Sequence, residues 1–380
     1  MKPSLNVRFW SSVLVIALIA IPGVISVANI LSGPDESRDE RIARTPDLPV
    51  DIESIKRFPG DFRFYIKERY GLKKIFVWLN SKFKASTFGV SPYPEVLIGE
   101  DGFLFLGGSE ATDFHQNLHP FSGPQKKKWE TYFVNIAKEL EERKIRYSVL
   151  IAPNKHTIYP DKLPGWVNQK KIGPTMSDTL IDIAEKATGV RPVKIKNVLE
   201  NARAADPSTL LYHRTDSHWN DYGAAIAINA LLDHLDIGRQ VLSKTVQIEH
   251  GRGGDLARMI GQAYDMPETA NSVRVNAEVK CFSSSGKPYP RNQFDPLHSD
   301  RITCKNTHGI PGRVLVFIDS FGVSIIPSLS SVFTETVFAW QYQVDLSLID
   351  ELHPDLVIQQ FVERKLSIIK PENLMTGPET

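Results

Sequence analysis

Val314-Leu315-Val316-Phe317-Ile318-Asp319-Ser320-Phe321-Gly322 is the stretch that indicates the fold most directly. Five successive apolar residues are typical of a short strand that is buried on both faces of a sheet. The run ends abruptly at Asp319 and Ser320, and a helix is predicted to follow from Phe321. Ligands of an open α/β sheet bind beyond the carboxyl ends of the strands. Ser320 is therefore predicted to present its hydroxyl at a binding edge; the alternative is that it only caps the next helix.

The segments around this strand alternate between helical and strand patterns. Helices are predicted at 125–143, 176–187, 198–204, 221–235 (capped by Asn220) and 346–352, and strands at 146–152, 210–212, 337–340 and 356–360. Such alternation predicts an α/β fold with a mostly parallel sheet and helices on both faces. Residues 96–99 and 103–106 flank Glu100-Asp101-Gly102, which predicts a hairpin. Residues 240–312, rich in Gly, Ser, Pro and Asn, are interpreted as an inserted subregion.

A second motif, Thr215-Asp216-Ser217-His218-Trp219-Asn220, carries the groups that a serine nucleophile needs. An imidazole titrates near pH 6.5, so His218 can take a proton from a hydroxyl and return it to a leaving group. Residues i and i+2 of an extended segment point to the same side, so Asp216 can orient that imidazole. Together with Ser320, the pair predicts serine-based acyl transfer.

Two alternatives to this triad remain open from the residues alone. Asp216 and His218 can belong to a surface loop, where they make only local hydrogen bonds. His213, Asp216, His218 and Asp221 lie within nine residues and offer imidazole and carboxylate ligands for a metal. Their spacing matches no familiar metal motif, so neither a metal nor a cofactor is predicted.

The N-terminus predicts a membrane anchor. Residues 9–31 contain no charged residue and are long enough to cross a bilayer as a helix. Basic residues precede this run and acidic residues follow it, which predicts a cytoplasmic N-terminus and an exported remainder. A cleaved signal peptide, with Ser26-Val27-Ala28 at the cleavage site, is the alternative. The predicted organisation is an anchor at 1–32, a linker at 33–60 and a catalytic domain at 61–375.

Charge and cysteine content limit the choice of partner and compartment. The chain has 45 basic and 44 acidic residues among 380, so no global field favours nucleic acid. Cys281 and Cys304 are its two cysteines. In an exported protein they can form a disulfide; two free buried thiols are the alternative.

Several motifs together resemble one known family. Asp216-Ser217-His218-Trp219-Asn220, followed by Tyr222-Gly223-Ala224, is similar to the signature of the alginate O-acetyltransferase proteins with an SGNH-hydrolase-like domain. Further similar stretches are Val96–Phe105, Ala152–Lys155 with Ile158–Pro160, Gly254–Met259 and Val362–Arg364. The resemblance covers roughly residues 60–370 in the family's order, and it implies an SGNH-hydrolase-like (flavodoxin-like) sheet.

By this resemblance Ser320 is the nucleophile, His218 the general base and acid, and Asp216 the residue that orients it. The family acetylates hydroxyls of exported polysaccharides, and a multi-spanning membrane acyltransferase is thought to supply the acetyl group to its anchored members. The resemblance thus implies a polysaccharide acceptor and a single-pass protein of the bacterial inner membrane, with its catalytic domain in the periplasm. An esterase with the same triad and a silent glycan-binding scaffold are the alternatives.

Four further residues enter the prediction. Lys155, Tyr159 and Arg364 are candidates for binding an anionic sugar, and each can equally form a structural pair. Ile318 stands where the family usually has Gly before Asp-Ser-Phe, and a β-branched residue restricts the backbone there. This departure predicts a restricted backbone at the oxyanion hole, and it favours the scaffold alternative.

Overall fold

The computed structural model describes residues 9–16, 20–21, 24, 46–69, 73–169, 173–238, 241, 245–273, 278–289 and 301–377. The chain divides into two compact units, Met1–Pro92 and Tyr93–Thr380. The first contains helices α2 (Ile52–Arg69) and α3 (Lys73–Phe88). Helix α2 begins inside the predicted linker, where the Asp51 carboxylate accepts the Ser54 N–H at 2.7 Å. Residues 61–92, predicted to belong to the catalytic domain, lie in this first unit.

Most of the predicted membrane anchor, residues 9–31, lies outside the described residues, although 9–16 are helical. Within the part of the chain that is described, no helix combines the length and the apolar character needed to cross a bilayer.

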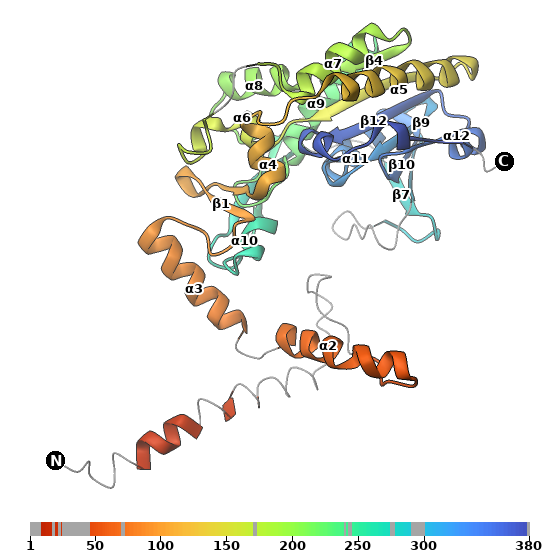
Figure 1. The fold of residues 1–380 in the computed structure, drawn as a ribbon. Helices are drawn as coiled ribbons and strands as arrows, with labels where there is room; N and C mark the ends of the chain where they lie inside the picture. Colours follow the sequence, from red (N-terminus) through yellow and green to blue (C-terminus); the bar gives the residue numbers. More distant parts are fainter. Residues whose placement is uncertain are drawn as a thin grey trace. The chain divides into compact units, whose positions relative to one another are not determined.

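A central sheet organises the second unit (Figure 1). In the described residues it has seven strands in the order β4-β3-β12-β9-β10-β8-β7. Their bounds are Val190–Val193, Arg146–Ala152, Leu356–Val362, Ile310–Ile318, Phe333–Trp340, Arg301–Asn306 and Val279–Ser283. Neighbours from β4 to β10 pair in parallel, whereas β8 and β7 pair antiparallel. The sheet is therefore mixed, and its antiparallel edge comes from the segment interpreted as an insertion.

Alternate residues of β9 explain the two layers of helices. Val314, Val316 and Ile318 belong to one buried cluster, while Leu315 and Phe317 belong to another, as the two-residue period of a strand requires. The first cluster includes α8 (Ile195–Ala205), α9 (Asp221–His234) and α11 (Ile326–Ser330). The second includes α5 (Gly123–Glu142), α7 (Met176–Lys186) and α12 (Leu346–Leu352). Helices thus cover both faces, as predicted.

Local capping signals explain where these helices begin. Ser122 and Gln125 form a capping box at α5, and Thr175 and Asp178 form one at α7. The predicted cap of α9 is confirmed, because the Asn220 side chain accepts the Gly223 N–H at 2.9 Å.

Smaller elements surround the sheet. The predicted hairpin is confirmed as β1 (Val96–Ile98) and β2 (Leu104–Leu106), joined by the 3-10 turn η1 (Glu100–Gly102). A separate antiparallel pair, β5 (Thr245–His250) and β6 (Glu268–Val273), lies in the predicted insertion together with α10 (Asp255–Met259). The other short elements are α4 (Gly108–His115), α6 (Lys155–Ile158), η2 (Pro160–Lys162), η4 (Glu363–Ser367), η5 (Pro371–Asn373) and the parallel pair β11 (Val344–Asp345) and β13 (Met375–Thr376).

Two local predictions need correction. Residues 210–212 do not form a strand, because Tyr212 makes only an isolated bridge with Trp219 across a tight loop. The segment after β9 is not an α-helix from Phe321 but a 3-10 helix, η3 (Ser320–Ile325), which leads into α11. Asp319 caps η3 by accepting the Phe321 N–H at 2.8 Å.

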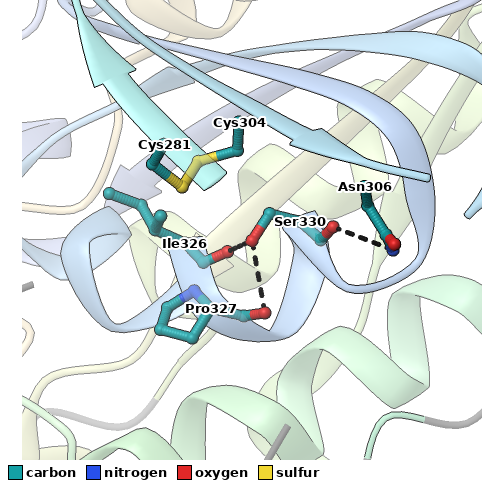
Figure 2. Close-up of a disulfide and its surroundings, with 6 residues drawn as sticks. All are labelled: Cys281, Cys304, Asn306, Ile326, Pro327 and Ser330. Atoms are coloured by element: carbon teal, nitrogen blue, oxygen red, sulfur yellow. Dashed lines mark hydrogen bonds between the residues drawn. A yellow bond between two sulfur atoms is a disulfide. The ribbon is translucent and has the colours of Figure 1, made fainter. Parts of the chain in front are cut away.

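The two cysteines are joined in a disulfide across the antiparallel edge of the sheet. Cys281 on β7 and Cys304 on β8 are direct cross-strand partners, and Figure 2 shows their bridge beside the turn of α11 that contains Ile326, Pro327 and Ser330. The question that the sequence left open is thereby settled in favour of the disulfide.

Candidate active site

The loop after Leu211 brings Asp216 and His218 together. Tyr212 and Trp219 bridge the base of the loop, and the His213 N–H donates to the His218 carbonyl at 3.2 Å. Within it, Asp216 Oδ1 lies 2.7 Å from His218 Nδ1 and also accepts the His218 backbone N–H at 3.1 Å. This geometry orients the imidazole with Nδ1 protonated toward the carboxylate, and it leaves Nε2 as the basic nitrogen.

Electrostatics reinforce this arrangement. Burial opposes ionisation of both groups, but their hydrogen bond and opposite charges outweigh it. The pKa of Asp216 is therefore held well below its usual value, and the pKa of His218 is raised above 6.5. His218 Nε2 is buried and has no hydrogen-bond partner among the described residues. An oriented imidazole with an unoccupied basic nitrogen is the arrangement that a general base requires.

Ser320 reaches the same edge of the sheet from the central strand β9. The Trp219 indole N–H donates to the Phe321 carbonyl at 2.9 Å, and the rings of His218 and Phe321 lie 4.9 Å apart. These contacts place the imidazole beside the residue that follows Ser320. No hydrogen bond between Ser320 and His218 is present in the described part of the chain, and such bonds often tighten only when substrate is bound.

Asp319 holds the turn that carries Ser320. Its Oδ1 accepts from Phe321 N at 2.8 Å and from Gln360 Nε2 at 2.9 Å, while Oδ2 accepts from Val362 N at 2.7 Å. Its own N–H donates to Gln360 Oε1 at 3.0 Å. Asp319 thereby ties the end of β9 to the end of β12, which fixes the backbone around Ser320.

Lys155 occupies a different place from the one predicted for a sugar-binding residue. It is buried, and its Nζ donates to the carbonyls of His213 at 2.9 Å, Arg214 at 3.1 Å and Asp216 at 2.6 Å. These three bonds use all the donors of an ammonium group. Burial lowers the pKa of Lys155 to about 8, against the pull of nearby carboxylates such as Asp216. Lys155 therefore supports the loop that carries the Asp-His pair.

Tyr159 and Arg364 also make internal contacts. The buried Tyr159 hydroxyl accepts the Leu211 N–H at 2.9 Å, just before the loop. Arg364 is 8% exposed, its Nη1 donates to Asn154 Oδ1 at 2.9 Å, and its guanidinium lies 5.2 Å from the centre of the Phe321 ring. Of the three predicted sugar-binding residues, Arg364 alone contacts a residue next to Ser320.

Asn154 and Glu363 were not singled out from the sequence as site residues. Asn154 follows β3, its N–H donates to Glu363 Oε1 at 2.8 Å, and Glu363 directly follows β12. Arg364 engages Oδ1 of Asn154, and the buried Nδ2 of the same amide has no partner among the residues described. The Ala152–Lys155 motif at a strand end was the available signal. An unsatisfied buried donor at this edge is suited to an oxyanion.

The four metal candidates do not assemble into one site. Asp221 accepts from Ser272 Oγ at 2.7 Å, and His213 faces Glu268 and His250. Among the described residues, Asp216 and His218 lie instead with Asp255, and one potential ligand atom of each lies within 4.8 Å of the others. At 2.7 Å, Asp216 Oδ1 and His218 Nδ1 are hydrogen-bonded to each other, which fits acid-base chemistry.

Ile318 is accommodated by a glycine four residues later. Its side chain is buried in the core cluster below the sheet edge. A Cβ on Gly322 would meet Ile318 Cβ at 2.4 Å, so the missing side chain at position 322 makes room for it. The departure from the family pattern thus lies in the core packing beneath the Ser320 turn.

Comparisons with known proteins agree with this fold. Residues 96–284 match the family model described as "SGNH hydrolase-like domain, acetyltransferase AlgX"; the match includes Asp216 and His218 and ends before Ser320. A DHHW family protein from Eubacterium siraeum aligns at 18% identity and a TM-score of 0.52, over 74% of this chain and 98% of that one. Bacillus cereus PatB1 aligns at 15% and 0.53, over 73% and 99%, and its sulfonyl adduct at 14% and 0.52, over the same shares.

No curated protein sequence matches the chain significantly. At such low identities the structural likenesses show a shared fold, and the family model adds the acetyltransferase class. Residues 96–284 therefore belong to an SGNH hydrolase-like acetyltransferase domain of the AlgX family.

Proposed function

We propose that this protein is an O-acetyltransferase that transfers acetyl groups to hydroxyls of an exported or cell-envelope polysaccharide through an acyl-enzyme on Ser320. The observation that carries the proposal is the imidazole of His218. Asp216 orients it, its Nε2 is unoccupied within the described residues, and its ring packs on Phe321 beside the serine. An oriented imidazole beside a serine supports the proposal that His218 activates the Ser320 hydroxyl.

The proposed reaction has two half-steps. In the first, His218 Nε2 takes the Ser320 hydroxyl proton while Oγ bonds to the acetyl carbonyl carbon; the imidazolium then protonates the leaving group as the donor bond breaks. In the second, His218 takes the proton of a sugar hydroxyl, whose oxygen attacks the acetyl group. Ser320 Oγ then leaves and recovers the proton. Asp216 stabilises the imidazolium in both half-steps.

The proposed oxyanion hole uses two donors. The N–H of Phe321 already donates to Asp319 Oδ1, and that of Gly322 donates to the Asp319 carbonyl. We therefore assign the Ser320 N–H and Asn154 Nδ2 to the oxyanion. Each such donor typically contributes about 10²–10³-fold in rate, so Asn154→Ala should lower kcat far more than KM.

A chromogenic acetyl ester tests the proposal with the full-length protein in detergent. Wild type should release the chromophore and gain an acetyl group on Ser320 by mass spectrometry, whereas Ser320→Ala and His218→Ala should lose both signals. Ser285→Ala, which changes a serine of an exposed turn, should behave as wild type. Inactivity of folded wild type toward several acetyl donors would remove the acyl-enzyme and favour the scaffold.

The acceptor decides between transfer and ester hydrolysis. With an exported polysaccharide present, a transferase should form acetylated sugar at the expense of free acetate, and Ser320→Ala should form none. If acetate release is the same with and without the polysaccharide, the protein is an esterase. Activity that requires an added divalent metal and is abolished by EDTA would overturn the acid-base mechanism.

We further propose that the protein is anchored in the bacterial inner membrane, with its catalytic domain in the periplasm and a multi-spanning acyltransferase as its acetyl supplier. The uncharged run at 9–31 supports the anchor, and the Cys281–Cys304 disulfide is typical of an oxidising compartment. Protease treatment of spheroplasts should degrade the domain at 93–380 from outside. Protection of the domain until the membrane is lysed would contradict this topology.

A further inference from the structure

Helix α10 begins directly against the loop that carries the Asp-His pair. The Asp255 N–H donates to Asp216 Oδ2 at 2.8 Å. In return, the carboxylate of Asp255 accepts from Ser217 N at 2.7 Å and from Ser217 Oγ at 2.6 Å. Each segment therefore satisfies polar groups of the other, and both oxygens of Asp216 are engaged: Oδ1 by His218 and Oδ2 by Asp255.

Two glycines permit this close approach. A Cβ on Gly254 would meet Asp216 Cβ at 2.3 Å and its Oδ2 at 2.6 Å, distances that packed atoms do not tolerate. A Cβ on Gly253 would meet the Met266 carbonyl oxygen at 2.7 Å and Thr215 Oγ1 at 3.0 Å. The Gly254 N–H in turn donates to Thr215 Oγ1 at 2.8 Å. The Gly-Gly-Asp sequence at 253–255 thus fits the back of the loop closely.

The Asp255 carboxylate also faces the catalytic imidazole. Its Oδ2 lies 3.7 Å from His218 Nδ1, and Ser217 Oγ, which donates to that oxygen, lies 3.3 Å from the same nitrogen. Two carboxylates therefore stand behind one imidazole. Asp216 contacts Nδ1 directly, while Asp255 acts at slightly longer range. Arg364 is the opposing positive charge at the imidazole, and Lys155 is the cation near both carboxylates.

We propose that Asp255 is a positioning residue for acyl transfer: its backbone and carboxylate hold the Asp216–Ser217–His218 loop, and its negative charge strengthens His218 as a base. This inference rests on the proposed function. A carboxylate at 3.7 Å favours the imidazolium, so its loss should make His218 a weaker base. The alternative is that Asp255 acts only through its hydrogen bonds to Ser217, in which case removing its charge would not affect the imidazole.

Asp255→Asn separates these roles because it keeps the shape and an acceptor oxygen for Ser217 while it removes the charge. The measurement is the pH profile of ester turnover by the full-length protein. The acidic midpoint of kcat/KM should fall by about 0.5–1 pH unit, and kcat at neutral pH should drop about tenfold with an unchanged KM for the ester. A profile identical to wild type, or a midpoint shifted upward, would overturn the proposal.

A matched control and a second readout keep the test decisive. Asp345→Asn also removes a carboxylate that accepts backbone N–H groups at a helix start, on α12, and should leave the profile unchanged. If Asp255→Asn fails to fold, Asp255→Glu retains the charge; it should keep the midpoint near wild type while kcat falls, and an unchanged kcat would contradict positioning.

NMR titration of labelled histidines separates this inference from the proposed function. The His218 signal is assigned by comparison with His218→Gln, and its pKa is read without any turnover. The pKa should fall in Asp255→Asn even if no acetyl donor is accepted, whereas an unchanged value would remove the charge effect. If wild type shows no ester turnover but the pKa of His218 still falls in Asp255→Asn, the result contradicts the proposed function and supports the charge effect of Asp255.

Discussion

At the scale of single residues, His218 combines two opposing effects. Burial disfavours the charged imidazolium, while the hydrogen bond and charge of Asp216 favour it more strongly. The pKa of His218 therefore lies above its ordinary value, which favours the protonated imidazole; in the proposed mechanism this is the form that cannot act as the base. If His218 is the proposed base, the same contact that orients the imidazole should move the pH range of activity toward alkaline values.

The pH dependence follows from this direction. Because only neutral His218 can accept the serine proton, ester turnover should rise with pH through a midpoint above 6.5 and then reach a plateau. The stability linked to His218 has the opposite sign: it is complete below the unfolded pKa of the imidazole and is lost as pH rises through the folded pKa. The stability linked to Asp216, whose pKa is lowered, is lost as pH falls through its folded pKa. A profile of kcat/KM from pH 5 to 9 checks the prediction, and a midpoint below 6.5 would contradict it.

Lys155 supports a second prediction at this scale. Lys155→Met should lower the free energy of unfolding by about 2–3 kcal/mol, because three carbonyls of the loop lose a charged donor. Ester turnover should fall as well, since the loop holds Asp216. Urea denaturation and turnover measure the two effects. Lys127→Met, which removes only an exposed ion pair with Glu130, should change stability by less than about 0.5 kcal/mol. Equal behaviour of the two variants would argue against the supporting role.

At the scale of elements, the junction of β9 and η3 depends on one close contact. Ile318 fills the core below the turn, and Gly322 in the following 3-10 helix lies against it. Asp319 then ties this junction to β12 through Gln360 and Val362. The position of Ser320 is therefore set by the packing of a strand end against the next helical turn, in addition to local backbone preference.

Gly322→Ala tests that packing. The added methyl group overlaps Ile318 Cβ, so the variant should lose about 1–3 kcal/mol of unfolding free energy and much of its ester turnover. Ile318→Gly in the same chain removes the overlap and should restore part of the turnover, although it leaves a cavity. Gly123→Ala, at a helix start with open space around it, should be nearly neutral. Thermal denaturation and ester assays decide, and a neutral Gly322→Ala would refute the packing argument.

At the scale of the whole domain, the sheet collects residues from distant segments along one edge. Strands β3, β12 and β9 are neighbours with their carboxyl ends aligned, so Asn154, Glu363 and Ser320 follow three adjacent strands. The loop with Asp216 and His218 then packs on this edge through Trp219 and Phe321. At one end of the strand order lie β8 and β7, which the disulfide joins.

The disulfide should matter for stability more than for chemistry. Cys281→Ser with Cys304→Ser should lower the free energy of unfolding by about 2–4 kcal/mol, because the unfolded chain regains the freedom of a 23-residue loop. Ester turnover of the folded variant should stay close to wild type, since β10 and β8 separate Cys281 from β9. Urea denaturation with and without a reductant measures this effect. An effect of reductant on the double variant, or none on wild type, would contradict the assignment.

Much of the fold could be predicted because it is encoded locally. The apolar runs at Arg146–Ala152 and Val314–Ile318, and the helical spacing at 125–143, correspond to β3, β9 and α5. The contact between Asp216 and His218 was also predictable, because the two residues are only two positions apart. The antiparallel strands β7 and β8 were missed, since turn-forming residues at 240–312 obscure short strands whose partners are distant in sequence.

The periodic strands and helices, the adjacent Asp-His pair and the apolar N-terminal run could be read without any structure, because each depends on neighbouring residues. Tertiary structure decided which backbone groups Lys155 and Tyr159 meet, that Asn154 keeps an unpartnered donor among the described residues, and that Asp255 faces His218. It also decided the disulfide between Cys281 and Cys304. A hydrogen bond, an ion pair or a disulfide depends on which distant segments folding brings within a few ångströms, and residue type alone does not specify that neighbour.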